Sequence, residues 1–583
     1  MHHNLSDHLV DLLENIYTKN AIDVDRLAVA NQLLQSMRLE PNANAFCAPK
    51  NLWSEQDVVL ITYGNTITND KKNHLSALKH FADEHCKNIT NTLHILPFFP
   101  ASADAGFAVK DYRTVDPALG SWQDIENLCV DYHVMADLVI NHGSDQSDWF
   151  EQFCLANPTY KDFYYTADPR ADISRVTRPR TSPLLTRVET ADGERYVWCT
   201  FSANQVDFNF ENPAVLLEFV SIIRFYLDRG IRIFRLDAVA FLWKRVGTSC
   251  INLPETHLVI RLLRLLIEHA QPDAVVVTET NIPNRQNLEY FGNANEAHWI
   301  YNFSLPPLLV YSLLAGDCHY LKQWMMSMPP AQNGTAYFNF IASHDGIGLR
   351  PTEGLLSERE IDRMLATIGN FGGKISYRTL ESGEVKPYEM NIALYDALQG
   401  TFAGPDGFNI ERFTCAHAIM FALEGVPGLY IHSLVGTNND YEGMQANGDN
   451  RSINRRQWQS DELDALLNKK NHHSEVLSQL KALLAIRIKQ PAFHPNATQF
   501  TLHLGESLFG FWRQSIDRSQ SIFCISNITP KKCALPLSAV NLIETENWFD
   551  LISGTPLSDY RGELQLAPYQ TLWITNSSKQ AAT

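Results

Sequence analysis

The feature that most constrains this fold is an alternation, beginning at Asp57, of short apolar runs with amphipathic helical stretches. The runs are β-rich and predominantly apolar along their length, which suits strands buried on both faces of a parallel sheet. Eight such runs occur, at residues 58–64, 92–99, 134–142, 231–239, 274–280, 298–305, 336–345 and 428–434. Eight strand–helix units predict an α/β fold, a closed (β/α)8 or TIM barrel.

One intervening helix is expected at 213–229, where Asn212 is a plausible N-cap, Pro213 starts the first turn and Gly230 ends the helix. Two connections are too long for simple loops: about 90 residues follow the third strand and about 85 follow the seventh. We therefore expect inserted subdomains at about 143–210 and 350–400.

The two ends of the chain follow other patterns. Residues 1–52 carry apolar positions at helical spacing, among them Leu9, Leu13, Leu27 and Leu34, and predict a helical extension before a barrel spanning 53–494. Residues 495–583 contain alternating runs at 500–512, 521–529 and 570–576, followed by a polar tail. They predict a small C-terminal antiparallel β domain.

Charge and cysteine usage exclude some functions. The 583 residues carry a net charge of −17, which argues against binding to nucleic acid or to anionic membranes. The ten cysteines are scattered singly, and the first 17 residues contain acidic side chains where a secretory signal needs a basic region. We expect a cytoplasmic protein with reduced thiols.

Polar side chains close four of the predicted strands, where a barrel places its active site. These are Asp137, Asn141 and His142 on the third strand, Arg235 and Asp237 on the fourth, Glu279 on the fifth, and His344 and Asp345 on the seventh. A single Asp at a strand end is as often a cap or a loop ligand as a functional group. Three strands that end in carboxylates are much harder to assign to chance.

The carboxylates suit glycosidic-bond cleavage with retention, which needs one carboxylate nucleophile and one carboxyl acid/base about 5–5.5 Å apart. Arg235 lies two residues before Asp237, so both side chains point to the same face and the guanidinium favours the ionised carboxylate. Glu279 closes a run of Val and Thr that could raise its pKa, as an acid requires.

The segments DLVINH, RLDAVAF, ETN and SHDGIG, in this order, resemble the signature regions of glycoside hydrolase family 13, the α-amylase superfamily. This resemblance implies that Asp237 is the nucleophile, Glu279 the acid/base and Asp345 the transition-state stabiliser. It also implies that Arg235, His142 and His344 are ligands of the glucose.

Further segments, among them 93–112, 303–309 and 343–348, resemble the sucrose phosphorylase subfamily, in which inorganic phosphate releases the glucosyl-enzyme as α-glucose 1-phosphate. Phosphate is then a co-substrate, and no cofactor is expected. The resemblance implies a set of further substrate and phosphate ligands, namely Asp104 and Arg451 at the far edge of the glucose, Phe107 as its apolar wall, Gln205 lining the site, and Arg180 with Tyr388 on loops that handle phosphate and acceptor.

A closer resemblance, to the glucosylglycerate phosphorylase branch, is carried by the helical leader and by the segments TRPRTSPLLT, PYEMNIALYDAL and DNRSINRR. This resemblance implies a glycerate acceptor, with Glu389 beside Tyr388 in the acceptor site. A cation must then bind the glycerate carboxylate. The candidates are Arg180, Arg455 and Arg456, and the sequence does not distinguish among them. Glucosylglycerol, sucrose and sucrose 6′-phosphate also stay open as substrates.

Two rivals remain, a family 13 α-glucosidase or transglucosylase and a non-catalytic amylase-like subunit. The latter would carry a membrane segment and lack the carboxylates. Many amylases hold calcium near the third-strand Asn, but Asn141 has no clear companion oxygen cluster, so we expect no metal. The expected partners are a glucoside and phosphate; a homodimer stays an open alternative.

Overall fold

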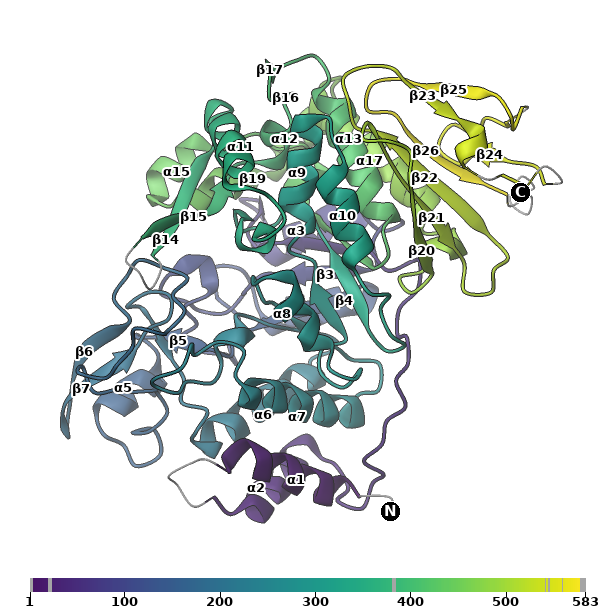
Figure 1. Ribbon diagram of the computed structural model, residues 1–583. Helices are drawn as coiled ribbons and strands as arrows, with labels where there is room; N and C mark the ends of the chain where they lie inside the picture. Colours follow the sequence, from purple (N-terminus) through teal and green to yellow (C-terminus); the bar gives the residue numbers. More distant parts are fainter. Residues whose placement is uncertain are drawn as a thin grey trace.

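Eight parallel strands close into a barrel in the computed structural model, which describes residues 4–18, 24–379, 384–540, 542–543, 546–557 and 559–576 (Figure 1). In barrel order the strands are β1 (Val59–Thr62), β3 (Thr92–Ile95), β4 (His133–Leu138), β9 (Ile233–Leu236), β10 (Val275–Thr278), β11 (Trp299–Tyr301), β12 (Ala336–Asn339) and β18 (Val426–Tyr430). Each lies within or overlaps one predicted run, so the predicted TIM barrel is confirmed.

The barrel strands are shorter than the apolar runs that predicted them. The eighth run was predicted as strand to residue 434, but residues Ile431–Leu434 form the helical turn α14. An apolar run indicates buried residues, and residues 431–434 stay buried although they have left the hydrogen-bonded barrel sheet for a turn packed on the barrel rim. The predicted carboxylates Asp237, Glu279 and Asp345 therefore follow the strands, whereas Arg235 lies within β9.

Helices surround the barrel, and side-chain caps begin α3, α4, α6 and α17. They include α3 (His74–His85), α4 (Trp122–Asp131), α6 (Pro213–Asp228), α7 (Pro254–Ala270), α9 (Leu305–Ala315), α10 (His319–Ser327), α13 (Asn409–Ala422), α16 (Ser460–Leu467) and α17 (His472–Arg487). The predicted helix at 213–229 is α6: the Asn212 side chain accepts a hydrogen bond from the Ala214 N–H, and Gly230 takes a φ of +90°.

Two N-terminal helices, α1 (Leu5–Tyr17) and α2 (Arg26–Met37), lie against α6 and α7 at one end of the molecule (Figure 1). Leu9, Leu13 and Leu34 are buried as expected, but Leu27, in the first turn of α2, is 57% exposed. Arg38, just after α2, pairs with Asp228 at the end of α6 at 2.9 Å. The expected residues 1–3 and 19–23 of this extension lie outside the described residues.

Small sheets fill both long connections. The first holds β5 (His142–Ser144) paired with β8 (Gln205–Asp207), α5 (Asp148–Cys154), and the hairpin of β6 (Leu185–Thr190) and β7 (Gly193–Trp198). The second holds β13 (Ile347–Gly348), β14 (Lys374–Thr379) and β15 (Val385–Asn391), with β15 between the other two, and α11 (Glu358–Asn370). Residues 380–383 of the second lie outside the described part.

The C-terminal sheet has the order β20 (Thr498–Leu502), β21 (Leu508–Gln514), β22 (Ser521–Asn527), β26 (Thr571–Thr575) and β24 (Phe549–Asp550), and its named strand pairs are antiparallel. The predicted strand at 500–512 is two strands, because Gly505 at a φ of +85° lies in the turn that reverses the chain. The tail after Asn576 lies outside the described residues. The boundaries at 52/53 and 494/495 stay predictions.

Candidate active site

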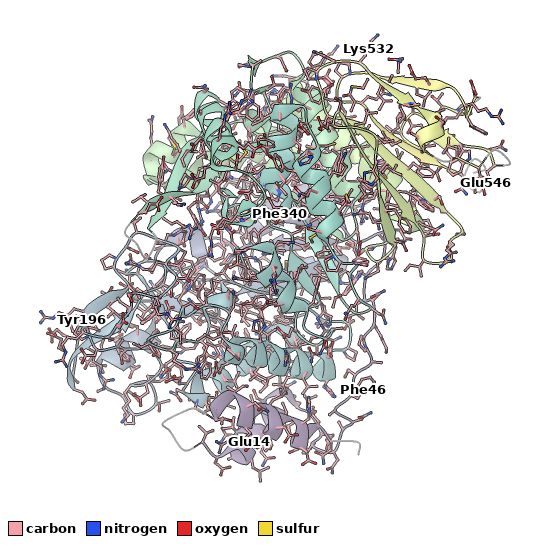
Figure 2. The ribbon with its side chains drawn as sticks, in the orientation of Figure 1. Glu14, Phe46, Tyr196, Phe340, Lys532 and Glu546 are labelled. Carbon is pink, nitrogen blue, oxygen red and sulfur yellow. The ribbon has the colours of Figure 1, made fainter. Side chains whose placement is uncertain are left out.

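A cavity of about 990 Å³, measured with its open mouth, lies at the carboxyl ends of the barrel strands. Figure 2 shows Phe340, one of its lining residues, near the centre of the molecule. Every predicted site residue except Glu389 lines this cavity: Asp104, Phe107, His142, Arg180, Gln205, Arg235, Asp237, Glu279, His344, Asp345, Tyr388 and Arg451. Residues far apart in the sequence therefore meet at one place.

Asp237 directly follows β9, and its N–H donates to the Leu138 carbonyl of the neighbouring strand at 3.1 Å. Arg235 Nη1 donates to Asp237 Oδ1 at 2.7 Å, as the two-residue spacing predicted. The same Nη1 also donates to Asp137 Oδ1. Asp137 is fully buried and receives His94 Nε2 at 2.8 Å on its other oxygen. The sequence interpretation gave Asp137 no role, although a carboxylate within an apolar strand was a signal of one.

Glu279 directly follows β10, which pairs in parallel with β9 in a register that sets Leu236 opposite Thr278. Asp237 and Glu279 therefore occupy equivalent positions on adjacent strands, which run about 4.7–4.9 Å apart. Glu279 Oε2 accepts a hydrogen bond from the Ala238 N–H at 3.0 Å. This arrangement is compatible with the carboxyl separation of a retaining pair.

The two carboxyls share one buried environment. Burial raises the pKa of Glu279, an effect that Arg235 opposes and Asp345 reinforces. Burial also raises the pKa of Asp237, and Arg235, which was expected from the sequence to favour its ionised form, opposes this rise. The pair thus holds one negative charge more easily than two. The contact with Arg235 lowers the pKa of Asp237 and so favours the charge on Asp237 and the proton on Glu279.

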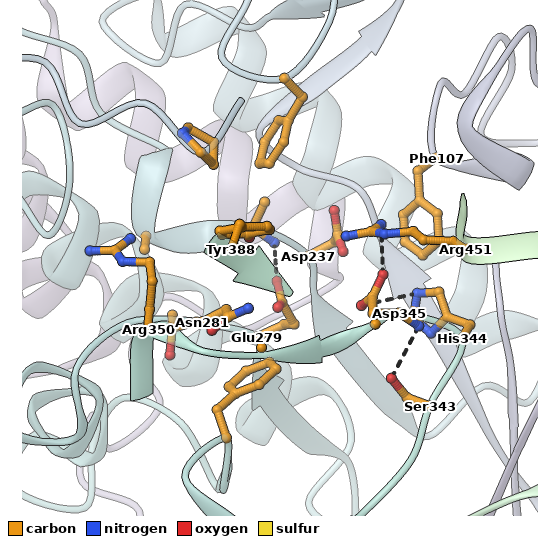
Figure 3. Close-up of a pocket in the computed structure, with 18 of the residues that line it drawn as sticks. Phe107, Asp237, Glu279, Asn281, Ser343, His344, Asp345, Arg350, Tyr388 and Arg451 are labelled. Carbon is orange, nitrogen blue, oxygen red and sulfur yellow. Dashed lines mark hydrogen bonds and ion pairs between the residues drawn. The ribbon is translucent and has the colours of Figure 1, made fainter. Parts of the chain in front are cut away.

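Asp345 lies on the loop after β12 and meets Arg451 Nη1 at 2.7 Å (Figure 3). Burial alone would raise its pKa, but Arg451 and Arg455 hold the pKa of Asp345 below its ordinary range. Burial lowers the pKa of the neighbouring His344 to about 3, so this imidazole is neutral. Its ring stacks on Phe107 with centroids 5.2 Å apart. Together these groups form an ionised, aromatic-walled end of the cavity.

A second polar cluster joins the first insert to the barrel rim. Gln205 Nε2 donates to Asp104 Oδ2 at 3.0 Å and lies 3.1 Å from His142 Nε2. The His142 ring nitrogen also lies 3.1 Å from the Phe107 carbonyl, and burial lowers the pKa of His142. The short β5–β8 ladder fixes Gln205 opposite Ser144, next to His142. The structure thus brings these three predicted residues into contact.

Arg180 and Tyr388 meet at the mouth, where the guanidinium carbon lies 5.5 Å from the ring centroid. Glu389 differs from expectation. It is 2% exposed and does not line the cavity; instead both of its oxygens accept from Arg451, at 2.9 and 3.0 Å. Successive residues of strand β15 point to opposite faces, so Tyr388 faces the cavity and Glu389 cannot.

The sequence left three arginines as possible ligands of an acceptor carboxylate, and the structure places them in different surroundings. Arg180 lines the cavity. Arg455 Nε donates to the His344 carbonyl at 2.7 Å, behind the cavity wall, and Arg456 pairs with Glu462 at 2.9 Å and covers the Trp458 ring. A further cavity-lining arginine, Arg350, was missed because its sequence context carries no motif.

The place near Asn141 where amylases can hold calcium is filled by a side chain. Lys244 Nζ donates to Asn141 Oδ1 at 2.7 Å and contacts Asp207 Oδ2 at 2.8 Å, with all three side chains buried. An ammonium between these oxygens supplies the positive charge that a cation would bring, so the residues do not fit a metal here. Within the described ranges, no group of three or more His, Cys, Asp or Glu side chains could hold a metal ion.

No helix in the described part of the chain is both long and apolar enough to cross a membrane. All ten cysteines are free.

Comparisons with known proteins agree with this geometry. Residues 87–350 match the family described as "Alpha amylase, catalytic domain". The chain is 40% identical over 528 residues to the glucosylglycerate phosphorylase of Spirochaeta thermophila, covering 89% of this chain and 90% of that one. It is 36% identical over 580 residues to the glucosylglycerate phosphorylase of Escherichia coli, covering 98% and 100%.

Among solved structures, the sucrose 6F-phosphate phosphorylase from Thermoanaerobacter thermosaccharolyticum superimposes with a TM-score of 0.72 at 22% identity, covering 90% of this chain and 99% of that one, which supports the fold. The chain therefore belongs to the α-amylase family, glycoside hydrolase family 13, and within it to the glycoside phosphorylases related to sucrose phosphorylase.

Proposed function

We propose that this enzyme catalyses the reversible phosphorolysis of 2-O-α-D-glucosyl-D-glycerate to α-D-glucose 1-phosphate and D-glycerate. The observation that carries the proposal is the asymmetry of the cavity. One end is lined by Asp345, Arg451, His344 and Phe107, and suits a neutral sugar. The other end carries Arg180 and Arg350, which form no ion pair with a carboxylate of the described residues, and suits an anion. The names of the two relatives given above support the same substrate.

In the first step, Asp237 attacks the anomeric carbon of the glucosyl unit while the protonated Glu279 gives its proton to the glycosidic oxygen. The bond to glycerate breaks, and a β-glucosyl ester forms on Asp237. Arg235 stabilises the carboxylate before attack through its 2.7 Å contact. Asp345, held ionised by Arg451, hydrogen-bonds the sugar hydroxyls.

In the second step, phosphate enters the space that glycerate leaves. A phosphate oxygen attacks the anomeric carbon from the side opposite Asp237, the ester bond between that carbon and Asp237 breaks, and Asp237 leaves as a carboxylate. Glu279 takes the proton of the attacking phosphate oxygen, and α-glucose 1-phosphate is released. Two inversions give net retention. Arg180 is the phosphate ligand, because its guanidinium matches phosphate oxygens and, among the described residues, it stacks on the Tyr388 ring and forms no ion pair with a carboxylate.

The substrate is tested by supplying glucosylglycerate, glucosylglycerol, sucrose or sucrose 6′-phosphate with phosphate, and measuring glucose 1-phosphate enzymatically. Glucosylglycerate should give the highest kcat/KM. Release of free glucose without glucose 1-phosphate would refute phosphorolysis, and a higher kcat/KM with glucosylglycerol would refute the acceptor assignment.

The phosphate role is tested by Arg180→Ala, with Arg175→Ala as the matched control on the same loop. Arg175 is exposed, does not line the cavity and donates to the Gly247 carbonyl at 3.1 Å. Arg180→Ala should reduce phosphorolysis at least about tenfold more than hydrolysis, and the control should change neither. Equal loss of both reactions would contradict the assignment.

A cytoplasmic location and a homodimer stay predictions.

A further inference from the structure

Arg350 presents a cation to the cavity from the sheet that also presents Tyr388. It begins the short 3-10 turn η4 (Arg350–Thr352) directly after β13. The preceding Leu349 N–H donates to the Tyr388 carbonyl at 2.9 Å, so the ladder with β15 fixes where Arg350 leaves the sheet. Figure 3 shows the Arg350 side chain at the edge of the cavity beside Asn281.

The Arg350 guanidinium has no partner among the described residues. Its Nε is shielded from solvent yet makes no hydrogen bond, and no carboxylate oxygen lies within 4.0 Å. Glu353 is the carboxylate that acts electrostatically on Arg350, but it forms its ion pair with Arg378, at 2.6 Å. Asn281 Oδ1, beside it, is also buried without a partner. A largely buried guanidinium without a partner is unfavourable, and an anionic ligand would remove the penalty.

Arg350 lies at the acceptor end of the site. Figure 3 shows Glu279 between Arg350 with Asn281 on one side and Asp345 with Arg451 on the other. Because Glu279 protonates the glycosidic oxygen, the glucose extends toward Asp345 and the acceptor toward Arg350. The cavity arginines on the glucose side are engaged, Arg235 by Asp237 and Arg451 by Asp345.

We propose that Arg350 is the residue that recognises the carboxylate of the acceptor. This inference rests on the proposed function and deepens it, because it divides the two unpaired arginines: Arg180, stacked on Tyr388 from a loop, serves phosphate, and Arg350, fixed at a sheet edge, serves the acceptor. The planar Arg350 guanidinium, held at a fixed position, can bind both oxygens of a carboxylate at once, and this gives no advantage to a neutral polyol. The class of acceptor is thus a small hydroxy acid.

The experiment uses α-glucosyl fluoride as donor, so that phosphate is absent and only the acceptor varies. Transfer to D-glycerate and to glycerol is measured for the wild type, Arg350→Gln, Arg350→Lys and the control Arg378→Gln. The control removes a nearby positive charge that does not line the cavity. Hydrolysis of the fluoride without acceptor reports whether each variant is folded and forms the glucosyl-enzyme.

Arg350→Gln should raise the KM for glycerate by about 10- to 100-fold, and leave the KM for glycerol and the hydrolysis rate within about twofold. Arg350→Lys should recover part of the loss, since it restores charge without the fork. The control should change the glycerate KM less than about threefold, because Arg378 does not line the cavity and its guanidinium pairs with Glu353.

Equal losses with both acceptors, or an unchanged glycerate KM, would overturn the inference; so would a raised KM for phosphate in phosphorolysis with glycerate unaffected, which would make Arg350 the phosphate ligand. These failures are distinct from failure of the proposed function, which would show in the wild type as no preference for glycerate over glycerol.

Discussion

Glu389→Gln separates the two ends of the active site. The sequence placed Glu389 in the acceptor site, whereas the structure places it behind Arg451, which it binds through two hydrogen bonds of 2.9 and 3.0 Å. The carboxylate also packs under Gly346, where an added Cβ would lie 2.9 Å from Glu389 Cδ. Its role is then to hold Arg451, and through Arg451 the carboxylate of Asp345.

The size of the effect follows from the bonds removed. Glutamine keeps one carbonyl acceptor for Arg451 but loses the charge and turns an N–H group toward the guanidinium. The loss of one charge-assisted hydrogen bond is worth about 1.5–3 kcal/mol. If this appears in the transition state, kcat/KM falls about 10- to 100-fold, since each 1.36 kcal/mol is a factor of ten.

The assay compares donors and acceptors of different charge. Because Arg451 acts on the glucose, Glu389→Gln should lower kcat/KM equally for hydrolysis of α-glucosyl fluoride, transfer to glycerol and transfer to glycerate. Unfolding of the variant by circular dichroism serves as the control for stability. A variant that hydrolyses the fluoride normally but loses selectivity between glycerate and glycerol would refute this reasoning and return Glu389 to the acceptor site.

Other predictions concern the carboxylates and the buried lysine. Asp237→Asn should lower kcat by about 10⁴-fold or more in steady-state assays with unchanged circular dichroism, since no other group forms the ester; turnover near wild type would refute the nucleophile. Asp345→Asn removes a charge that raises the pKa of Glu279, so the alkaline limb of residual kcat/KM should move to lower pH, and a shift to higher pH would contradict the pair's coupling. Lys244→Met leaves buried oxygens without a cation and should destabilise the fold by about 3–5 kcal/mol in urea. The wild type should keep full activity after exhaustive EDTA treatment, and loss restored by calcium would refute the ammonium's role.

Much of the fold was predictable because burial on both faces leaves a strong pattern in the sequence. Each barrel strand was found, and the strand ends gave Asp237, Glu279 and Asp345 because carboxylates rarely follow apolar runs without a use. The apolar pattern misleads where residues stay buried beyond the last hydrogen bonds of a strand, as at residues 431–434, which form a helical turn.

The acceptor end was less predictable, because its residues come from inserts whose position depends on tertiary contacts. Glu389 was assigned to the cavity because it neighbours Tyr388, but strand alternation turns it to the other face. Arg350 was overlooked because an arginine after a strand resembles any exposed arginine. Only its missing partners and its place beside Asn281 distinguish it.

The central claim is that phosphate, rather than water, releases a glucosyl-enzyme made from an anionic glucoside. Its most direct test follows wild-type enzyme with 2-O-α-glucosylglycerate and phosphate by ¹H and ³¹P NMR. The structure predicts α-glucose 1-phosphate as the first-formed product, equimolar with glycerate. β-Glucose 1-phosphate, or free glucose as the first-formed product, would contradict it.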